Sequence, residues 1–483
     1  MKISKIVQIL IMLLLTTTYF AQVVEVTDDL SLNDAIVFVE GGGATEILLT
    51  TDGGVYYTKP FVVETVPIVI KAAPGLAVKP MIVTQNSGAG SFIVVKNDLK
   101  LDGIKLNGYD AATGIYDSVK YAIHVEALEG SANEEPDIII TNCEFTNIYK
   151  NGDPEFSKDG NILDFTKGAR GGTILLENCM FSNTGDEALR SINTHKDPVP
   201  KDGKFCNSFI VRNSTFSNIR GTGIKIEGDG DSTNTDPQIV MENLTFDSCQ
   251  RRVIWHRQMF SSVIRDILIT NSIKGNDDFS KSQALITYQG FGTTVSHIDT
   301  FNIQGVKANG DTVTLEYGTF VPEPGSHDGS QRLPVPVDES TVFNFDPGYA
   351  DAANGDYTLA SNSPLLSLGH DGLAIGDRNW AGQLVTDIKS NISKVPSSFK
   401  LSQNYPNPFN PTTQIQFSIP SSGNFSLKVY NILGQEVAEL FNGQLSAGNH
   451  TVDFDASSLS SGVYFYNFNG KNFNETKKML LLK

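Results

Sequence analysis

One recurring pattern in the middle of the chain constrains its fold more than any other feature. An apolar run, an Asn, a Phe three residues later and a second short apolar stretch follow one another in GTILLENCMFSNTGDEALRSI (172–192), SFIVRNSTFSNIRGTGIKIEG (208–228) and QIVMENLTFDSCQRRVIWHR (238–257). A longer form begins at Asp137. No sustained helical period is present. Short strands that cannot bury their apolar faces alone must stack, coil on coil, so we predict a right-handed parallel β-helix.

The asparagine of each repeat marks a corner between two strands. These corner residues are Asn142, Asn178, Asn213 and Asn243, with weaker versions at Asp102 and Asp266. Their spacings of 40, 36, 35, 30 and 23 residues leave room for one coil each, with insertions. We expect the stacked amides to satisfy one another and the backbone, so the Asn-x-x-Phe residues build the coil and carry no chemistry.

The segments that flank the repeat define the domain organisation. Residues 1–21 combine two lysines, an apolar stretch and a small residue at Ala21, which is typical of a secretory signal peptide. A short helix capped by Ser31 or Asn33 is expected to cover the first coil. We assign residues 22–382 to the β-helix domain, 383–394 to a linker and 395–483 to a small antiparallel β-sandwich.

Two further segments complete the predicted β-helix domain. Strands at 284–288, 295–298 and 312–317 are expected to continue the coil, and the Pro- and Gly-rich stretch 322–339 is expected to be a loop. Residues 356–380 resemble the closing segment of secreted pectate-lyase-like β-helix proteins.

Charge and cysteine content exclude several classes of protein. The formal net charge is −17, whereas nucleic-acid binding needs a surplus of Lys and Arg. After the signal peptide no apolar run approaches a membrane span, and we expect a secreted monomer. The four cysteines lack metal-binding spacing. Cys143 and Cys179 share one repeat position; strand spacing of about 4.8 Å allows a disulfide, but a reduced core pair is favoured.

Counting from the phenylalanines aligns the second strands of three coils without a gap. Because side chains alternate along a strand, Leu189, Ile224 and Ile254 should point inward, and His256 also falls in an inward register. The outward rows are Arg190, Lys225 and Trp255, and Ile192, Glu227 and Arg257. The alternative interpretation is that the charged residues of these two rows are ordinary exposed charges without a catalytic or binding role.

A flat row of stacked strands suits a long acidic polysaccharide. β-Elimination from a uronate needs a cation for the carboxylate, a base for the proton at C5 and an acid for the leaving oxygen. We predict Lys225 as the base, since neighbouring cations favour the neutral amine, and Arg190 and Arg257 as the neutralising cations. The candidate substrate-binding residues are Trp255, Lys196 and Glu227. The candidate Ca²⁺ ligands are Asp186, Glu187, Asp229 and Asp231, although the GDGD stretch (228–231) also suits a plain turn.

The last ninety or so residues carry a family resemblance. The blocks YPNPFNP (405–411), VYNILGQEV (429–437) and SGVYFY (461–466), with the basic and apolar tail 477–482, resemble the type A C-terminal sorting domain of the type IX secretion system. This resemblance implies export across the outer membrane, recognition by that secretion machinery, and release or surface anchoring.

The central repeats also resemble the chondroitinase B and alginate lyase group, polysaccharide lyase family 6. MFSNTGDEALRS and STFSNIRGTGIKIEG carry the resemblance, with Glu187 and Ser191 matching. Asn193 stands at the position of the catalytic lysine of that group, and Ile226 and Glu227 stand at its Arg and His. The resemblance therefore implies shared architecture, while the activity stays open among a lyase, a non-catalytic glycan-binding or adhesin-like solenoid, and a glycoside hydrolase.

Overall fold

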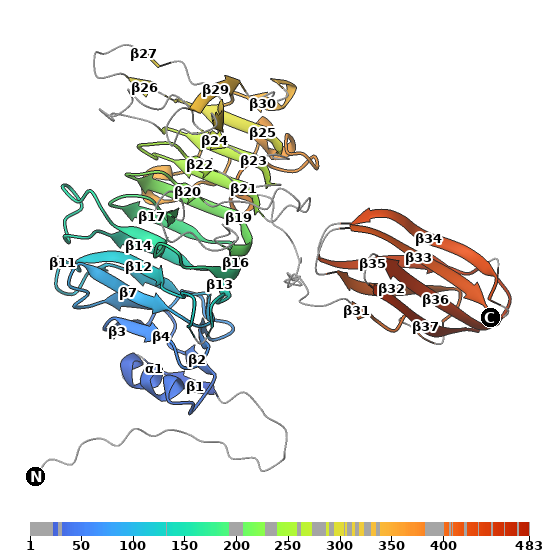
Figure 1. The fold of residues 1–483 in the computed structure, drawn as a ribbon. Helices are drawn as coiled ribbons and strands as arrows, with labels where there is room; N and C mark the ends of the chain where they lie inside the picture. Colours follow the sequence, from blue (N-terminus) through green and yellow to red (C-terminus); the bar gives the residue numbers. More distant parts are fainter. Residues whose placement is uncertain are drawn as a thin grey trace, which may run out of the picture. The chain divides into compact units, whose positions relative to one another are not determined.

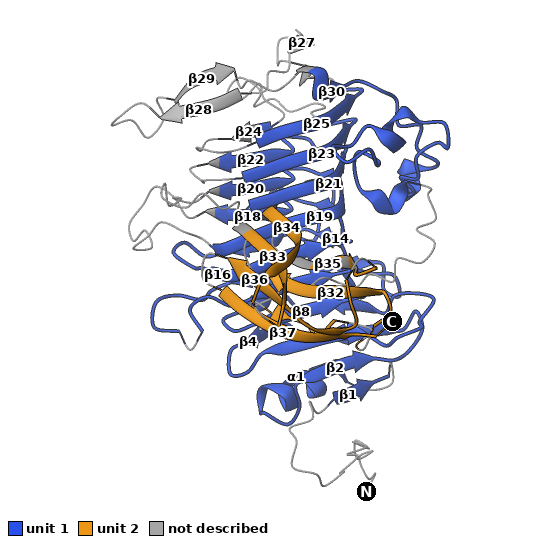
Figure 2. Cartoon of the chain, turned by 90° about the vertical axis from the view of Figure 1, so that its right-hand side faces the viewer, with its two compact units in different colours: residues 1–382 blue, residues 383–483 orange. Residues whose placement is uncertain are grey.

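The computed structural model divides the chain into two compact units, Met1–Gly382 and Gln383–Lys483 (Figure 2). It describes residues 23–27, 31–131, 133–192, 206–227, 239–257, 262–272, 286–288, 294–303, 305–306, 312–313, 318–322, 330–334, 339–381, 400–404, 407, 409–419, 423–432, 434–445, 448–457, 459–470 and 473–482. The proposed signal peptide and the proposed linker lie outside these ranges.

The first unit is a parallel β-helix, as the repeat predicted (Figure 1). The strands of its coils form three faces. Face A holds β1 (Val23–Val26), β2 (Glu46–Leu49), β5 (Ile68–Ala72), β8 (Leu99–Asp102), β13 (Ile138–Thr141) and β16 (Gly171–Glu177). Face B holds β3 (Val55–Thr58), β6 (Met81–Thr84), β9 (Lys105–Asn107), β14 (Glu144–Ile148) and β17 (Met180–Thr184).

Four long strands turn the corner and run through both of these faces. They are β19 (Cys206–Ile219), β21 (Ile239–Asp247), β23 (Ser262–Thr270) and β25 (Thr294–Phe301), with β30 (Val342–Phe343) pairing to the last. Face C is a separate sheet of β4 (Phe61–Val63), β7 (Gly90–Val95), β12 (Val119–Val125), β15 (Asn161–Phe165), β18 (Leu189–Ile192), β20 (Ile224–Glu227), β22 (Ile254–Arg257), β24 (Ile286–Tyr288) and β28 (Gly318–Pro322).

Apolar side chains stack in register inside the coils. Phe145, Phe181, Phe216 and Phe246 are fully buried, and their ring centroids follow one another at 5.8, 4.9 and 4.7 Å. Cys143 and Cys179 are buried free thiols, in agreement with a reduced pair. At the N-terminal end, Ser31 caps α1 (Leu32–Glu40) with its hydroxyl, which accepts from the Asp34 amide. The helix packs on the first coil, as expected for a segment that covers the end of a β-helix.

The predicted corner is a left-handed backbone position in every repeat. Asn142, Asn178, Asn213, Asn243 and Asp266 all have φ between 45° and 56°, a conformation that Asn and Asp tolerate better than other residues with a Cβ. The amide of Asn178 donates to Asn142 at 3.2 Å. The expected amide ladder is incomplete, because the Oδ1 atoms of Asn213 and Asn243 are buried without a hydrogen-bond partner.

A second row of left-handed residues, which sequence analysis missed, closes the other end of face B. It consists of Asn147, Asn183, Asn218, Ser248, Asn271 and Asn302.

A closing segment, residues 339–381, returns along face B. It contains η2 (Glu339–Thr341), η3 (Ala352–Asn354), η4 (Pro364–Ser367) and η5 (Arg378–Trp380). Trp380 Nε1 donates to Thr215 Oγ1 at 2.8 Å, and Leu359, Leu365 and Ile375 form a small core with Leu268.

Two expectations for the later part of the domain are wrong. The strand expected at 312–317 is β27 (Thr312–Val313), which pairs antiparallel with β26 (Gly305–Val306) and forms no coil. Within the expected loop 322–339, β29 (Ser330–Pro334) pairs antiparallel with β28. An antiparallel hairpin needs only a short connection, so these segments leave the coil pattern while keeping strand propensity. A similar hairpin, β10 (Tyr109–Asp110) with β11 (Ile115–Tyr116), interrupts an earlier coil.

The second unit consists of two antiparallel sheets, as predicted. One contains β31 (Lys400–Leu401), β32 (Thr412–Ile419) and β35 (Gly448–Asp455); the other contains β33 (Gly423–Asn431), β34 (Glu436–Leu445), β36 (Gly462–Gly470) and β37 (Phe473–Leu481). Phe417 and Phe425 pack on Phe468 with centroid distances of 4.2 and 5.3 Å. No helix in the described part of the chain is long and apolar enough to span a membrane.

Candidate active site

The predicted outward row lies on face C. In the parallel pairing of β18, β20 and β22, Arg190 is opposite Lys225 and Lys225 is opposite Trp255. The residues before them in each strand are buried, as alternation requires, and so is His256, which is 0% exposed. The alignment of the repeats in the sequence therefore correctly predicted that these three residues are neighbours on adjacent strands.

Arg190 is held by several groups at once. Its Nε donates to Asp164 Oδ1 at 2.5 Å, and its Nη2 donates to Tyr121 Oη at 3.2 Å. Its Nη1 lies 3.6 Å from Glu187 Oε2 and 3.9 Å from Asp186 Oδ2. Only 13% of the arginine side chain is exposed, so its direction is fixed by its neighbours.

Lys225 connects the carboxylates to an aromatic ring. Its Nζ lies 3.5 Å from Glu187 Oε1 and 4.6 Å from the centre of the Trp255 ring. The Arg252 guanidinium also lies over this ring, at 4.3 Å. Lys225 therefore lies between a carboxylate and the face of an aromatic ring.

Asp186 and Glu187 form a hydrogen-bonded carboxyl pair in the turn between β17 and β18. Burial, together with the charge of Glu187 and the hydrogen bond to it, raises the pKa of Asp186. Burial also opposes ionisation of Glu187, but the hydrogen bond from Asp186 and the charges of Lys225 and Arg190 outweigh it and lower the pKa of Glu187. The two shifts favour the protonated form at Asp186, which is the partly exposed member, and the ionised form at Glu187.

Two residues of this site were missed by sequence analysis. Asp164 on β15 is opposite Arg190, and His124 on β12 is opposite Asp164, so both continue the same row. Burial, followed by the charges of Lys120 and Arg190, lowers the pKa of His124 to about 4. Burial raises the pKa of Asp164 despite its bond to Arg190. The insertion between β14 and β15 displaces Asp164 from the common spacing, and the insertion between β9 and β12 displaces His124.

The other predicted site residues cannot be placed as side chains. The backbones of Glu227 and Arg257 are in register with Ile192, but their side chains lie outside the described residues, as do Lys196, Asp229 and Asp231. Ser191, which matches the lyase group, is fully buried in the core.

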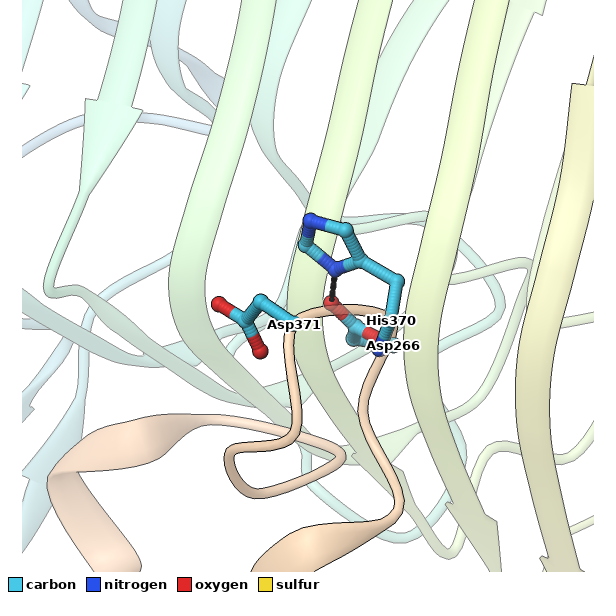
Figure 3. A group of neighbouring side chains, drawn as sticks. All are labelled: Asp266, His370 and Asp371. Atoms are coloured by element: carbon cyan, nitrogen blue, oxygen red, sulfur yellow. Dashed lines mark hydrogen bonds and ion pairs between the residues drawn. The ribbon is translucent and has the colours of Figure 1, made fainter.

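A second charged cluster joins the closing segment to the corner of a coil (Figure 3). Figure 3 shows His370 and Asp371 on a loop of the closing segment and Asp266 on the coil beside it. Ligand atoms of these three residues lie within 4.8 Å of one another. However, His370 Nδ1 lies 2.5 Å from Asp266 Oδ2, and Arg378 Nη2 lies 2.8 Å from Asp371 Oδ1 and 3.6 Å from Asp266 Oδ2. The Arg378 guanidinium supplies the positive charge that a metal ion would bring. We therefore interpret the cluster as a structural contact that attaches the closing segment to the coil.

Comparisons with known proteins identify the second unit. Residues 403–482 match the family described as "Secretion system C-terminal sorting domain". The chain is therefore an exported β-helix protein. Its C-terminal unit is a type IX sorting domain, which directs it through that system to the cell surface or to the medium.

The comparison with solved structures lists the enzymatically active domain of tailspike protein 4 of bacteriophage CBA120. The identity is 13%, the TM-score is 0.24, and the match covers 93% of this chain and 66% of that chain, which is less than two thirds of its length. No curated protein sequence matches the chain.

Proposed function

We propose that the protein binds and cleaves an acidic, uronate-containing polysaccharide on face C by β-elimination. One observation carries this proposal: Glu187 lies between two cations, Arg190 and Lys225, with Asp186 also beside Arg190 and Trp255 next in the row. Cation, proton donor and aromatic surface are thus within reach of one sugar unit. The flat row of strands extends the surface for a polymer at about 4.8 Å per strand.

In the proposed reaction, each group has one task. Arg190, with Arg257, faces the uronate carboxylate and stabilises the charge that develops when the proton at C5 leaves. Lys225 takes that proton as its amine, the C4–O4 bond breaks as the C4–C5 double bond forms, and Asp186 gives its proton to the departing O4. Trp255 supplies a surface on which a sugar ring can stack, and Lys196 and Glu227 extend the binding site.

Glu187 is already paired with Arg190 and Lys225, which bears on the proposed Ca²⁺. Asp186 Oδ1 lies 3.5 Å from Arg251 Nη1, so a calcium ion would depend chiefly on Asp229 and Asp231. The need for Ca²⁺ is tested by measuring the activity without a chelator, with a chelator, and after Ca²⁺ is restored. Activity that survives the chelator removes the ion from the proposal.

To test the lyase proposal, the exported protein is incubated with a panel of uronate polymers. The ultraviolet absorbance of the unsaturated uronate measures the product. Lys225→Ala should abolish this signal. Lys71→Ala is the matched control, because Lys71 is also paired with a glutamate, at 2.7 Å from Glu46, but lies on face A. An unchanged rate in Lys225→Ala refutes the assignment of Lys225 as the base.

A second candidate function is glycan binding without cleavage, as in an adhesin. It is favoured by the observation that Arg190 and Lys225 each have a carboxylate partner within the chain, which holds both side chains in place as parts of a fixed binding surface. It predicts saturable retention of the polymer with no unsaturated product. Hydrolysis needs two carboxyl groups roughly 5–9.5 Å apart; the proposed pair is Asp186 or Glu187 with Glu227, whose side chain lies outside the described residues. Reducing ends without unsaturation would support hydrolysis.

A further inference from the structure

A groove with a different chemistry lies on face B, where the closing segment runs beside the coils. It has a volume of about 810 Å³, within the roughly 300–1,000 Å³ that is usual for ligand sites. Its floor is formed by face B strands, and one wall is formed by residues 352–355 with Tyr357 and Trp380. We propose that this groove binds a neutral oligosaccharide, independently of the acidic polymer proposed for face C.

The floor presents hydroxyl and amide groups at the spacing of the strands. Ser182 and Ser217 are opposite each other on β17 and β19, and Asn183 and Asn218 follow them at the second left-handed corner. Such groups both donate and accept hydrogen bonds, as sugar hydroxyls do. Their repeat at about 4.8 Å offers the same contact to successive parts of an extended ligand.

A break in the asparagine row leaves one acceptor open to the groove. The amide of Asn218 donates to Asn183 Oδ1 at 2.7 Å. The next residue in the row is Ser248, which has no amide, and its hydroxyl bonds to Asp247 instead. Among the described residues no donor therefore bonds to Oδ1 of the exposed Asn218, and a ligand hydroxyl can do so.

The aromatic wall is held in place by the coil. Trp380 donates from Nε1 to Thr215, Tyr357 shares a hydrogen bond of 2.5 Å with Ser217, and the two rings meet edge to face at 5.9 Å. Trp380 is half-buried, so part of its ring lines the groove. An aromatic ring fixed beside hydroxyl and amide groups suits a sugar, which has apolar C–H faces and polar edges.

The charges of the groove cancel, in contrast to the cationic row on face C. Glu144 is paired with Lys79 at 2.8 Å and with Lys105 at 3.5 Å. Asp247 is 5% exposed, and its oxygens accept hydrogen bonds from side chains of the chain itself. An acidic ligand would find no unpaired cation among the described lining residues, so the preferred ligand is neutral.

The two tryptophans of the chain make the proposal directly testable. In full-length Trp255→Phe, the remaining tryptophan emission comes from Trp380 in the groove. We expect at least one of cello-, xylo-, manno- and malto-hexaose to shift this emission saturably, and oligogalacturonate to leave it unchanged. In Trp380→Phe, the remaining emission reports face C, so failure at one site is distinguished from failure at the other.

The side-chain test uses glycine, because both positions have positive φ, which glycine adopts freely. Asn218→Gly should weaken the binding of the hexaose about threefold to tenfold, as expected for one lost hydrogen bond. Asn147→Gly, the control at a member of the same row that bonds to Asn107 and does not line the groove, should leave the binding unchanged. Three results would each overturn the proposal. They are no response to any of the four sugars, equal affinity in the two glycine variants, and a response to oligogalacturonate alone.

Discussion

The stack of phenylalanines allows a quantitative test of the β-helix. Phe216 is fully buried, and its ring lies between Phe181 at 4.9 Å and Phe246 at 4.7 Å. Phe145 is equally buried, but it has a single aromatic neighbour in the stack, at 5.8 Å, and Leu106 on its other side. The two positions differ mainly in aromatic contact.

Truncation to alanine should therefore cost more at Phe216 than at Phe145. Removing a buried Phe side chain costs about 3–5 kcal/mol in transfer and cavity terms, and each aromatic pair contributes about 0.5–1.5 kcal/mol. Phe216→Ala loses two close pairs and should fall near the top of this range. Phe145→Ala loses one wider pair and should unfold with a penalty smaller by about 1 kcal/mol.

Urea unfolding followed by tryptophan fluorescence measures this difference in the full chain. Trp255 and Trp380, the only two tryptophans of the sequence, both lie in the first unit, so the signal reports the β-helix and not the sorting domain. A cost below about 1 kcal/mol for Phe216→Ala, or a larger cost for Phe145→Ala, would refute the reasoning that this stack stabilises the coils.

Three further predictions follow from the charges and from the sorting domain. Burial raises the pKa of Asp299 to about 7; because the folded chain keeps this proton where the unfolded chain loses it, stability falls as pH rises from about 4 to about 7. In thermal melts, Asp299→Asn should therefore be more stable than wild type above about pH 7 and equal to it near pH 4. Glu187→Gln removes a charge that raises the pKa of Asp186, so the alkaline limb of the proposed pH–rate profile should move to lower pH; an unmoved limb would exclude Asp186 as the acid. Truncation before residue 395 should abolish export, and cell fractionation that still finds the protein outside the cell would contradict the role of the sorting domain.

The architecture was predictable because the repeat combines two independent constraints. A left-handed corner favours Asn or Asp, and an inward stack favours Phe three residues later. The register of each coil can therefore be predicted from these two residues. Arg190, Lys225 and Trp255 could be aligned from this register alone. The asparagine row was also visible in the sequence, as the Asn two residues after Phe145, Phe181 and Phe216, but its corner role required the backbone conformation.

The rest of the site depends on contacts that the repeat does not encode. Asp164 and His124 belong to coils whose insertions displace them from the common spacing. The choice of which carboxyl group holds the proton depends on burial and on the distances of Glu187 from Lys225 and Arg190. The segment at 312–317 keeps the composition of a strand, so the sequence did not distinguish the hairpin of β26 and β27 from a further coil. The Pro and Gly residues of 322–339 predicted a loop where β29 pairs with β28.

The central claim is that the row on face C cleaves a uronate polymer. The most direct test is the rate of unsaturated product formation by the exported protein on the panel of uronate polymers, compared with the rate of Lys225→Ala on the polymer that reacts. The proposal predicts product from at least one polymer and none from the variant. Saturable retention of a polymer with no unsaturated product from any of them would contradict cleavage and identify the row as a binding surface.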